Sequence, residues 1–189
     1  MANNFFTDIK IDPRDQLKSI QWYKAQIRNL GALNDSSIMQ KNRFLSNRII
    51  NGKLYLFFYN PKNKNTLPYY DTFPLVFPFR RTKDGFYGLN LHYIPYMLRI
   101  RLLSYLADYL NNDKMDETTR LVFTWRTLVN SAKFNPVKAC VKQYLNAHVE
   151  SRFFEIPVEN WITASTLPIE RFESASKQTV WRDSNRKIQ

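Results

Sequence analysis

The sequence predicts an α+β fold, in which a small antiparallel β-barrel or sheet is flanked by N-terminal and C-terminal helices. Residues 51–94 are dense in aromatic side chains, prolines and tight-turn signals, a pattern typical of short antiparallel strands. From Pro95 onward, apolar residues recur instead at helical spacing. We therefore expect one domain over 1–189, made of N-terminal helices (1–50), a β unit (51–94), a helical part (95–173) and a basic tail (174–189).

Two helices are expected before the β unit. Asp12 is a suitable N-cap for the first helix, because Pro13 then takes the first helical position. Apolar residues follow at helical spacing until Gly31, which ends the helix. A shorter and more polar helix is expected from Asp35 to about Arg48.

Three strands are expected in the β unit. Leu54–Tyr59 is apolar and aromatic throughout, as in a strand buried on both faces. Phe73–Arg81 contains two prolines, which cannot donate to a ladder, so an edge or irregular strand is predicted. Asp84-Gly85 is a hairpin signal. The third strand is Phe86–Ile94, where Gly88 marks a bulge or a close backbone approach.

The helical part is expected to hold three longer helices. An apolar stripe runs from Met97 to Leu110, Asp116 caps the second helix, and the third extends from Pro136 through His148. Arg152–Ile156 is predicted to return as an edge strand, and Pro157–Ile162 to begin a short helix.

Residues able to perform chemistry are few. Cys140 is the only cysteine, which excludes an internal disulfide and fits a reducing compartment or a capsid assembled in one. His92 and His148 are too far apart in sequence to form a zinc site with it. On the predicted helix, Cys140 and His148 stand about 12 Å apart, beyond hydrogen-bonding reach. We therefore expect no catalytic, cofactor-binding or metal-binding residues and no enzymatic activity.

These residues instead receive structural interpretations. Cys140 is interpreted as a buried core thiol, and His92 as a structural histidine that bonds a backbone group. The aspartates lie at expected turns and caps. Asp71, within YYDTFP, is expected to accept backbone N–H bonds in a turn, so that Asp71→Ala would cost about 1 kcal/mol.

Positive charge is the main indication of a partner. Lys and Arg number 28 against 16 Asp and Glu, a net charge of +12. Such a surplus favours nucleic acid, an anionic membrane or an acidic protein surface as partner. The N-terminus shows no signal pattern and no apolar run is long enough to span a bilayer, so we expect a soluble cytoplasmic protein without a membrane partner. Residues 174–189 are expected to be a mobile or partner-ordered tail.

The basic residues fall into groups that together form a candidate phosphate-binding track on DNA. Each group alone is most often just a solvated surface, and the hairpin group Arg80, Arg81 and Lys83 fits pairing with acidic residues of a neighbouring subunit equally well. Tyr69 and Tyr70 are the candidates for stacking on unpaired bases. The candidate DNA-binding residues are Lys62, Lys64, Arg80, Arg81, Lys83, Arg99, Arg101, Lys133, Lys138, Lys142, Lys177, Arg182, Arg186 and Lys187.

Two long motifs, LPYYDTFPL and GFYGLNLHYIP, are specific enough to indicate a family. Together with VKQYLNAHVESRFFEIPVENW and LPIERF, they make the chain from Trp22 to Ser184 similar to virion proteins of T-even-like phages with contractile tails. Members of that family are commonly labelled as DNA end protectors or as virion proteins without an assigned role.

The resemblance implies a non-enzymatic virion protein that binds the terminus of packaged DNA near the head-tail junction. Its partners would be double-stranded DNA ends or other virion proteins in a larger assembly, in the virion and, during assembly, in the host cytoplasm. The alternative is a purely structural neck, tail or baseplate subunit that assembles through protein-protein contacts. The two motifs do not separate these functions, because both also serve folding: their prolines and glycine set the backbone and their tyrosines supply packing.

Overall fold

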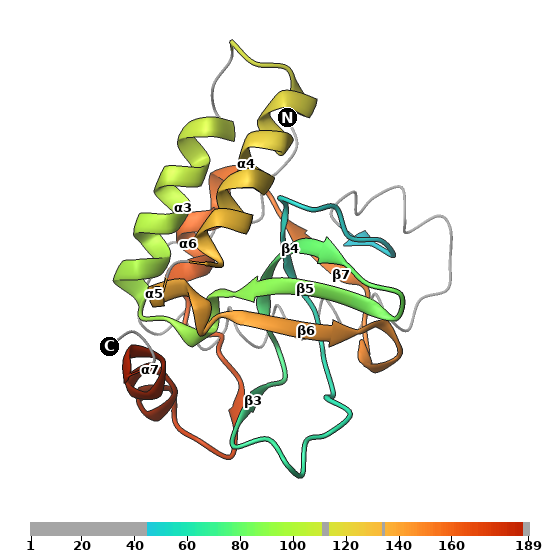
Figure 1. Cartoon of the computed structure of the whole chain (residues 1–189), viewed down its shortest axis with the longest axis vertical. Coiled ribbons are helices and arrows are strands. Elements are labelled where there is room, and N and C mark those ends of the chain that lie inside the picture. The colour runs from blue at the N-terminus through green and yellow to red at the C-terminus, as the bar shows by residue number, and fades with distance from the viewer. Residues whose placement is uncertain (1–44, 111–113, 134, 187–189) are drawn as a thin grey trace.

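The computed structural model describes residues 45–110, 114–133 and 135–186. Its centre is a six-stranded antiparallel sheet in the order β1-β7-β2-β4-β5-β6, beside a two-stranded sheet of β3 and β8 (Figure 1). The predicted α+β class and antiparallel sheet are confirmed, but the sheet is not closed into a barrel. The strands are β1 Leu45–Ser46, β2 Leu54–Leu56, β3 Tyr70–Asp71, β4 Leu75–Arg81, β5 Gly85–Asn90, β6 Val141–Leu145, β7 Phe153–Ile156 and β8 Phe172–Glu173.

The longer helices pack together over one face of the large sheet (Figure 1). Asp116 caps α4 as predicted, because its Oδ1 accepts the Thr119 N–H at 2.9 Å. The predicted helix from Met97 to Leu110 and the short helix in Pro157–Ile162 are also confirmed. The helices are α3 Tyr96–Leu110, α4 Glu117–Ser131, α5 Asn135–Lys138, α6 Trp161–Thr166 and α7 Lys177–Arg186, with 3-10 turns at Leu91–Tyr93, Asn146–His148 and Val158–Asn160.

Both faces of the large sheet are buried. Leu54 and Leu56 of β2 enter the core shared with the helices, whereas Tyr55 and Phe57 enter a second core on the opposite face. The second core is aromatic: the Phe57 ring lies 5.2 Å from that of Tyr144. The uninterrupted apolar character of this segment is thereby explained, and its predicted two-sided burial is confirmed.

Strand β4 is irregular, as its prolines predict, but it is not an edge strand. It lies between β2 and β5, with a register shift between Pro78 and Arg80. The sheet tolerates Pro78 because β2 pairs only with Leu75 and Val76, so the missing N–H lies beyond the end of that ladder. The Pro78 carbonyl still accepts the Gly52 N–H at 3.2 Å.

The β4–β5 hairpin depends on close backbone contacts. The predicted turn at Asp84-Gly85 is confirmed, and the Thr82 N–H donates to the Gly85 carbonyl at 2.9 Å. A Cβ on Gly85 would stand 1.8 Å from the Tyr144 carbonyl oxygen. A Cβ on Gly88 would stand 2.3 Å from Val76 Cγ1, which confirms the close approach predicted there.

The C-terminal half differs most from expectation. The predicted helix from Pro136 to His148 is wrong, because α5 ends at Lys138 and β6 begins at Val141. Pairing with β5 places Tyr144 in the aromatic core, and this packing outweighs the helical spacing of the apolar residues. Arg152–Ile156 does contain a strand, β7, but it lies between β1 and β2 and is not at an edge.

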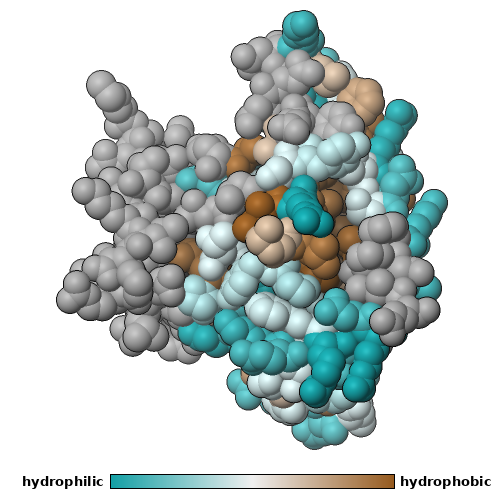
Figure 2. Space-filling model, turned by 90° about the vertical axis from the view of Figure 1, so that its left-hand side faces the viewer, coloured by the Kyte–Doolittle hydropathy of each residue, from teal (hydrophilic) through white to brown (hydrophobic). Residues whose placement is uncertain are grey.

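The remaining differences lie near the two ends of the chain. The predicted helix starting at Asp12 lies outside the described residues, and at the end of the second predicted helix Leu45–Ser46 forms β1. Residues 174–186 are not a free tail, because α7 buries Val180 and Ser184 against the rest of the fold. Figure 2 shows the side of the molecule on which α7 lies in Figure 1, and the lower part of this side is mainly hydrophilic. Within the described residues, no helix is long and apolar enough to span a membrane.

Candidate nucleic-acid interface

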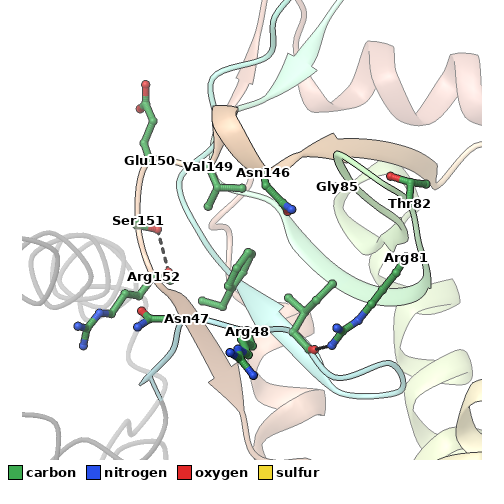
Figure 3. Close-up of a pocket in the computed structure, with 12 residues that line it drawn as sticks. Asn47, Arg48, Arg81, Thr82, Gly85, Asn146, Val149, Glu150, Ser151 and Arg152 are labelled. Carbon is green, nitrogen blue, oxygen red and sulfur yellow. Dashed lines mark hydrogen bonds between the residues drawn. The ribbon is translucent and has the colours of Figure 1, made fainter.

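A pocket of about 680 Å³ opens where the β4–β5 hairpin meets the connection between β6 and β7 (Figure 3). Three arginines line it, Arg48, Arg81 and Arg152, together with one acidic residue, Glu150. We call this the arginine pocket. The rest of the lining is polar or small: Asn47, Ile49, Thr82, Gly85, Asn146, Val149, Ser151 and Phe153.

Strand pairing brings the three arginines together. In the antiparallel pair β1–β7, Ser46 faces Phe153. Arg48, two residues after β1, and Arg152, one residue before β7, therefore lie at the same end of the sheet. Arg81 is the last residue of β4 and reaches this end from the hairpin.

One bond fixes the Arg81 side chain along the pocket wall. Its Nη2 donates to the Ile49 carbonyl (Figure 3). A guanidinium has five N–H donors, so this bond positions the group and leaves capacity for an anion. Arg48 is exposed, and in Figure 3 the Glu150 carboxylate points away from the three guanidinium groups. The pocket is thus a concave site of positive charge.

The hairpin adds two further basic side chains next to the pocket. Arg80 and Lys83 are exposed. The Arg80 guanidinium carbon lies 4.4 Å from the centre of the Tyr87 ring, a cation-π contact that restrains the side chain. The predicted group Arg80, Arg81 and Lys83 therefore lies together at the tip of the β4–β5 hairpin.

The other predicted residues do not line the arginine pocket. Some of them already make contacts within the fold: Lys142 Nζ lies 3.9 Å from the centre of the Tyr93 ring, and Lys177 Nζ donates to the Tyr96 hydroxyl at 3.1 Å. Lys187 lies outside the described residues. Lys62 and Lys64 lie in the loop before β3, Arg101 on α3, Lys133 after α4, Lys138 at the end of α5, Lys142 on β6, and Lys177, Arg182 and Arg186 on α7.

Arg99 is a correction to the predicted DNA-binding set, because its side chain is completely buried. Its Nη2 lies 2.7 Å from Glu170 Oε1 as an ion pair. Its Nε donates to the Ile94 carbonyl at 2.8 Å, and further N–H groups donate to the carbonyls of His92 and Ser165. A guanidinium held in this way cannot reach a phosphate, so we remove Arg99 from the set.

A family model described as phage T4 terminal DNA protecting protein matches residues 7–186. The chain belongs to this family. No curated protein matches the sequence, and no solved structure matches it. The resemblance given by the LPYYD and GLNLHY motifs is confirmed, and the protein is a bacteriophage DNA end protector.

In this end protector, the two motifs converge on a buried charged group. Asp71 Oδ1 accepts the backbone N–H groups of Phe73 and Arg171 at 3.1 and 3.2 Å. Its Oδ2 accepts from Asn90 Nδ2 at 3.1 Å and lies 2.7 Å from His92 Nδ1. The predicted acceptance of backbone N–H bonds is confirmed. Asp71, Asn90, His92, Arg99 and Glu170 are all buried, and we call them the ionic centre.

The pKa directions of the ionic centre agree with a structural role. Burial alone would raise the pKa of the Asp71 carboxyl, but the facing His92 and the hydrogen bonds from His92, Asn90 and Phe73 hold the pKa below its usual value. Burial opposes ionisation of Glu170 too, yet His92 and Arg99 keep its pKa lowered. His92 is buried as predicted, but its ring faces a carboxylate where a backbone group was expected.

The remaining candidates for chemistry are also structural. Cys140 is completely buried, and burial raises the pKa of its thiol to about 12, which suppresses the reactive thiolate. His148 Nδ1 lies 2.9 Å from the Asn60 carbonyl. Among the described residues, no group of three or more His, Cys, Asp or Glu is placed to hold a metal ion.

Sequence reasoning missed Arg48 and Arg152 in the end protector's pocket. Arg48 was expected at the end of a helix, and Arg152 at the start of an edge strand. Only the pairing of β1 with β7, across about a hundred residues, brings them to one site. Arg99, in contrast, had a signal in the sequence. It precedes the buried Leu103 and Leu106 by four and seven residues, which is the spacing of one helix face.

Proposed function

We propose that this end protector binds the terminus of linear duplex DNA with the arginine pocket and the adjacent hairpin residues Arg80 and Lys83. The observation that supports the proposal most directly is the pocket itself, a concave surface lined by Arg48, Arg81 and Arg152 with one carboxylate at the rim. Arginine forks suit phosphate oxygens, because they donate two parallel hydrogen bonds to them.

Protection then needs no chemistry. A protein seated on a DNA end occupies the position that an exonuclease must take, so occlusion is sufficient. We expect the purified protein neither to cut nor to join DNA when magnesium, manganese or zinc is present. Turnover that a single substitution at His92, His148 or Cys140 abolished would overturn this part of the proposal.

We place the protein in the virion, near the head-tail junction where a DNA terminus lies, and in the host cytoplasm during assembly. Its partners there would be double-stranded DNA ends and other virion proteins. The family match and the basic charge support this location. Exposed basic residues away from the pocket, such as Arg101 and Arg182, are available for contacts with the flanking duplex or with neighbouring subunits.

The deciding experiment compares linear and circular DNA in one salt titration, followed by exonuclease digestion. Linear DNA should bind more tightly and resist digestion at protein concentrations that leave internal sites bare. Affinity should fall steeply with salt, because each neutralised phosphate releases condensed counterions. Equal affinity for both forms without protection would favour the alternative of a purely structural neck, tail or baseplate subunit.

Two variants of equal charge change locate the binding surface. One combines Arg48→Gln, Arg81→Gln and Arg152→Gln in the pocket. The control combines Arg101→Gln, Lys133→Gln and Lys138→Gln, which are exposed and outside the pocket. Only the pocket variant should lose protection, and its salt slope should flatten by about one unit for each lost phosphate contact. An equal loss in both variants would mean that net charge, not the pocket, carries binding.

A further inference from the structure

We infer that the arginine pocket binds the terminal phosphate monoester of a DNA strand, and that this contact distinguishes an end from the interior of the duplex. The inference rests on the proposed function, since it names the group that the pocket recognises at the end. General affinity for DNA does not depend on a contact with the terminal phosphate, because any basic surface attracts the phosphodiester backbone.

The charge of the pocket matches this ligand. A phosphate monoester carries about −1.5 to −2 charges at pH 7 and three strong acceptor oxygens, whereas each internal phosphodiester carries one charge. Arg48 and Arg81 each supply a positive charge to the pocket, and the Glu150 carboxylate points away from them (Figure 3). The excess of positive charge in the pocket therefore favours the more highly charged group.

The shape of the pocket supports the same choice. A volume of about 680 Å³ lies within the range of small-molecule sites, about 300 to 1,000 Å³. The side of a DNA duplex is broad, since its major groove alone is about 12 Å wide. The side of the duplex would therefore lie across the pocket without filling it. A strand end, in contrast, can enter and place its phosphate beside the guanidinium groups of Arg48 and Arg81.

The neutral lining adds hydrogen-bonding groups and constrains the wall. Asn47 and Asn146 contribute side-chain amides to the pocket. Ser151 is already committed, because its hydroxyl donates to the Arg152 carbonyl and accepts the Phe58 N–H. The segment that carries Arg152 is thus bonded through Ser151 to Phe58, two residues after β2.

The test uses hairpin oligonucleotides with one blunt end that carries a 5′-phosphate, a 3′-phosphate or only hydroxyl groups. Wild-type protein should bind one of the phosphorylated ends about tenfold more tightly than the hydroxyl end, the scale of a set of charge-assisted hydrogen bonds. The variant with all three pocket arginines changed to Gln should bind all three ends equally. The Arg101, Lys133 and Lys138 control should keep the preference.

Two further variants separate recognition from folding. Arg48→Gln alone removes an exposed side chain and should reduce the preference for a phosphorylated end at an unchanged melting temperature. Glu150→Gln removes the only acidic group of the lining and should strengthen binding of the phosphorylated end. Loss of preference only in variants that also melt earlier would overturn the inference.

The outcomes distinguish this inference from the proposed function. Exonuclease protection that is equal for phosphorylated and hydroxyl ends would overturn the phosphate contact and leave end protection standing. Absence of protection on every end would overturn the proposed function itself. A deoxynucleoside 5′-monophosphate should bind at least a hundredfold more weakly than the phosphorylated duplex end. Comparable binding would assign the pocket to free nucleotides and overturn the inference.

Discussion

The ionic centre and the arginine pocket hold the same kind of side chain in opposite environments. In the ionic centre, the Arg99 guanidinium is buried, paired with Glu170 and bonded to three backbone carbonyls. In the pocket, Arg81 uses one N–H on a carbonyl and Arg48 is exposed. The first arrangement consumes the donors of an arginine within the fold, and the second presents them outward.

The difference shows that positive charge alone does not mark a DNA contact. What separates Arg99 from Arg48 and Arg81 is whether the fold already supplies an anion. Glu170 and Asp71 supply it in the ionic centre, whereas the one carboxylate in the pocket lining stands at the rim. Substitutions in the ionic centre should therefore lower stability, and substitutions in the pocket should lower DNA binding.

The largest expected effect is that of Arg99→Met. It leaves the Glu170 carboxylate buried without its partner, which costs about 4 kcal/mol in the free energy of unfolding. Urea denaturation measures it. Arg101→Met is the matched control, because Arg101 lies on the same helix and is exposed, and its effect should stay within about 0.5 kcal/mol. Equal effects of the two substitutions would mean that burial and ion pairing do not set Arg99 apart from an exposed arginine.

Asp71→Ala should come next, at about 3 kcal/mol. Two backbone N–H groups and two side chains lose their acceptor in a buried site, and each unsatisfied donor is costly. This loss exceeds the value of about 1 kcal/mol expected for a local turn, because Asp71 is buried and accepts hydrogen bonds from several distant parts of the chain. Asp71→Asn, which keeps one acceptor oxygen, should lose less. A loss of end protection by Asp71→Ala at an unchanged melting temperature would instead make Asp71 a contact residue.

A smaller effect is expected from acid. The pKa values of Asp71 and Glu170 are lowered in the folded protein, so near pH 4 the unfolded chain binds more protons than the folded one. Their contribution is therefore complete above the ordinary carboxyl pKa of about 4 and is lost as the pH falls through the folded values. Urea titrations at pH 7, 5 and 3 should show this loss, and Glu170→Gln should reduce it. A Glu170→Gln protein with the full acid sensitivity would contradict the assignment.

The smallest effect on stability belongs to Arg48→Gln in the pocket. The side chain is exposed, so the free energy of unfolding should change by no more than about 0.5 kcal/mol. The salt dependence of DNA binding should nevertheless flatten by about one unit, because one phosphate contact is lost. Calorimetry measures the change in stability, and the salt titration measures the change in DNA binding. Marked destabilisation would place Arg48 with the structural arginines.

The parts of the fold that the sequence predicted depend on local signals. The Asp116 cap and the Asp84-Gly85 turn are each specified by neighbouring residues, and both are confirmed. The helix predicted over 136–148 is wrong because the apolar spacing of this segment also fits a helix. Its strand state depends on β5, some fifty residues earlier, which pairs with Val141–Leu145. Local patterning cannot contain that information.

The candidate site was predictable to the same limited extent. Arg81 was found because its hairpin turn is local, whereas Arg48 and Arg152 depend on the β1–β7 pair. The arginines of the RIR sequence show the opposite case. Arg99 and Arg101 are two residues apart, about 200° around a helix, so one is buried and the other exposed. Helical phase was sufficient to separate them.

The attachment of α7 has a consequence for the order of folding. The Trp181 indole N–H donates to the His92 carbonyl at 2.8 Å, and β8 pairs with β3 across a hundred residues. The two motifs are therefore completed only by residues about ninety to a hundred positions later in the sequence. Such long-range contacts slow folding, because loop closure must precede the contacts that stabilise it. The nascent chain accordingly reaches this arrangement only after α7 has left the ribosome, and a truncation before α7 exposes the centre of the fold to proteolysis.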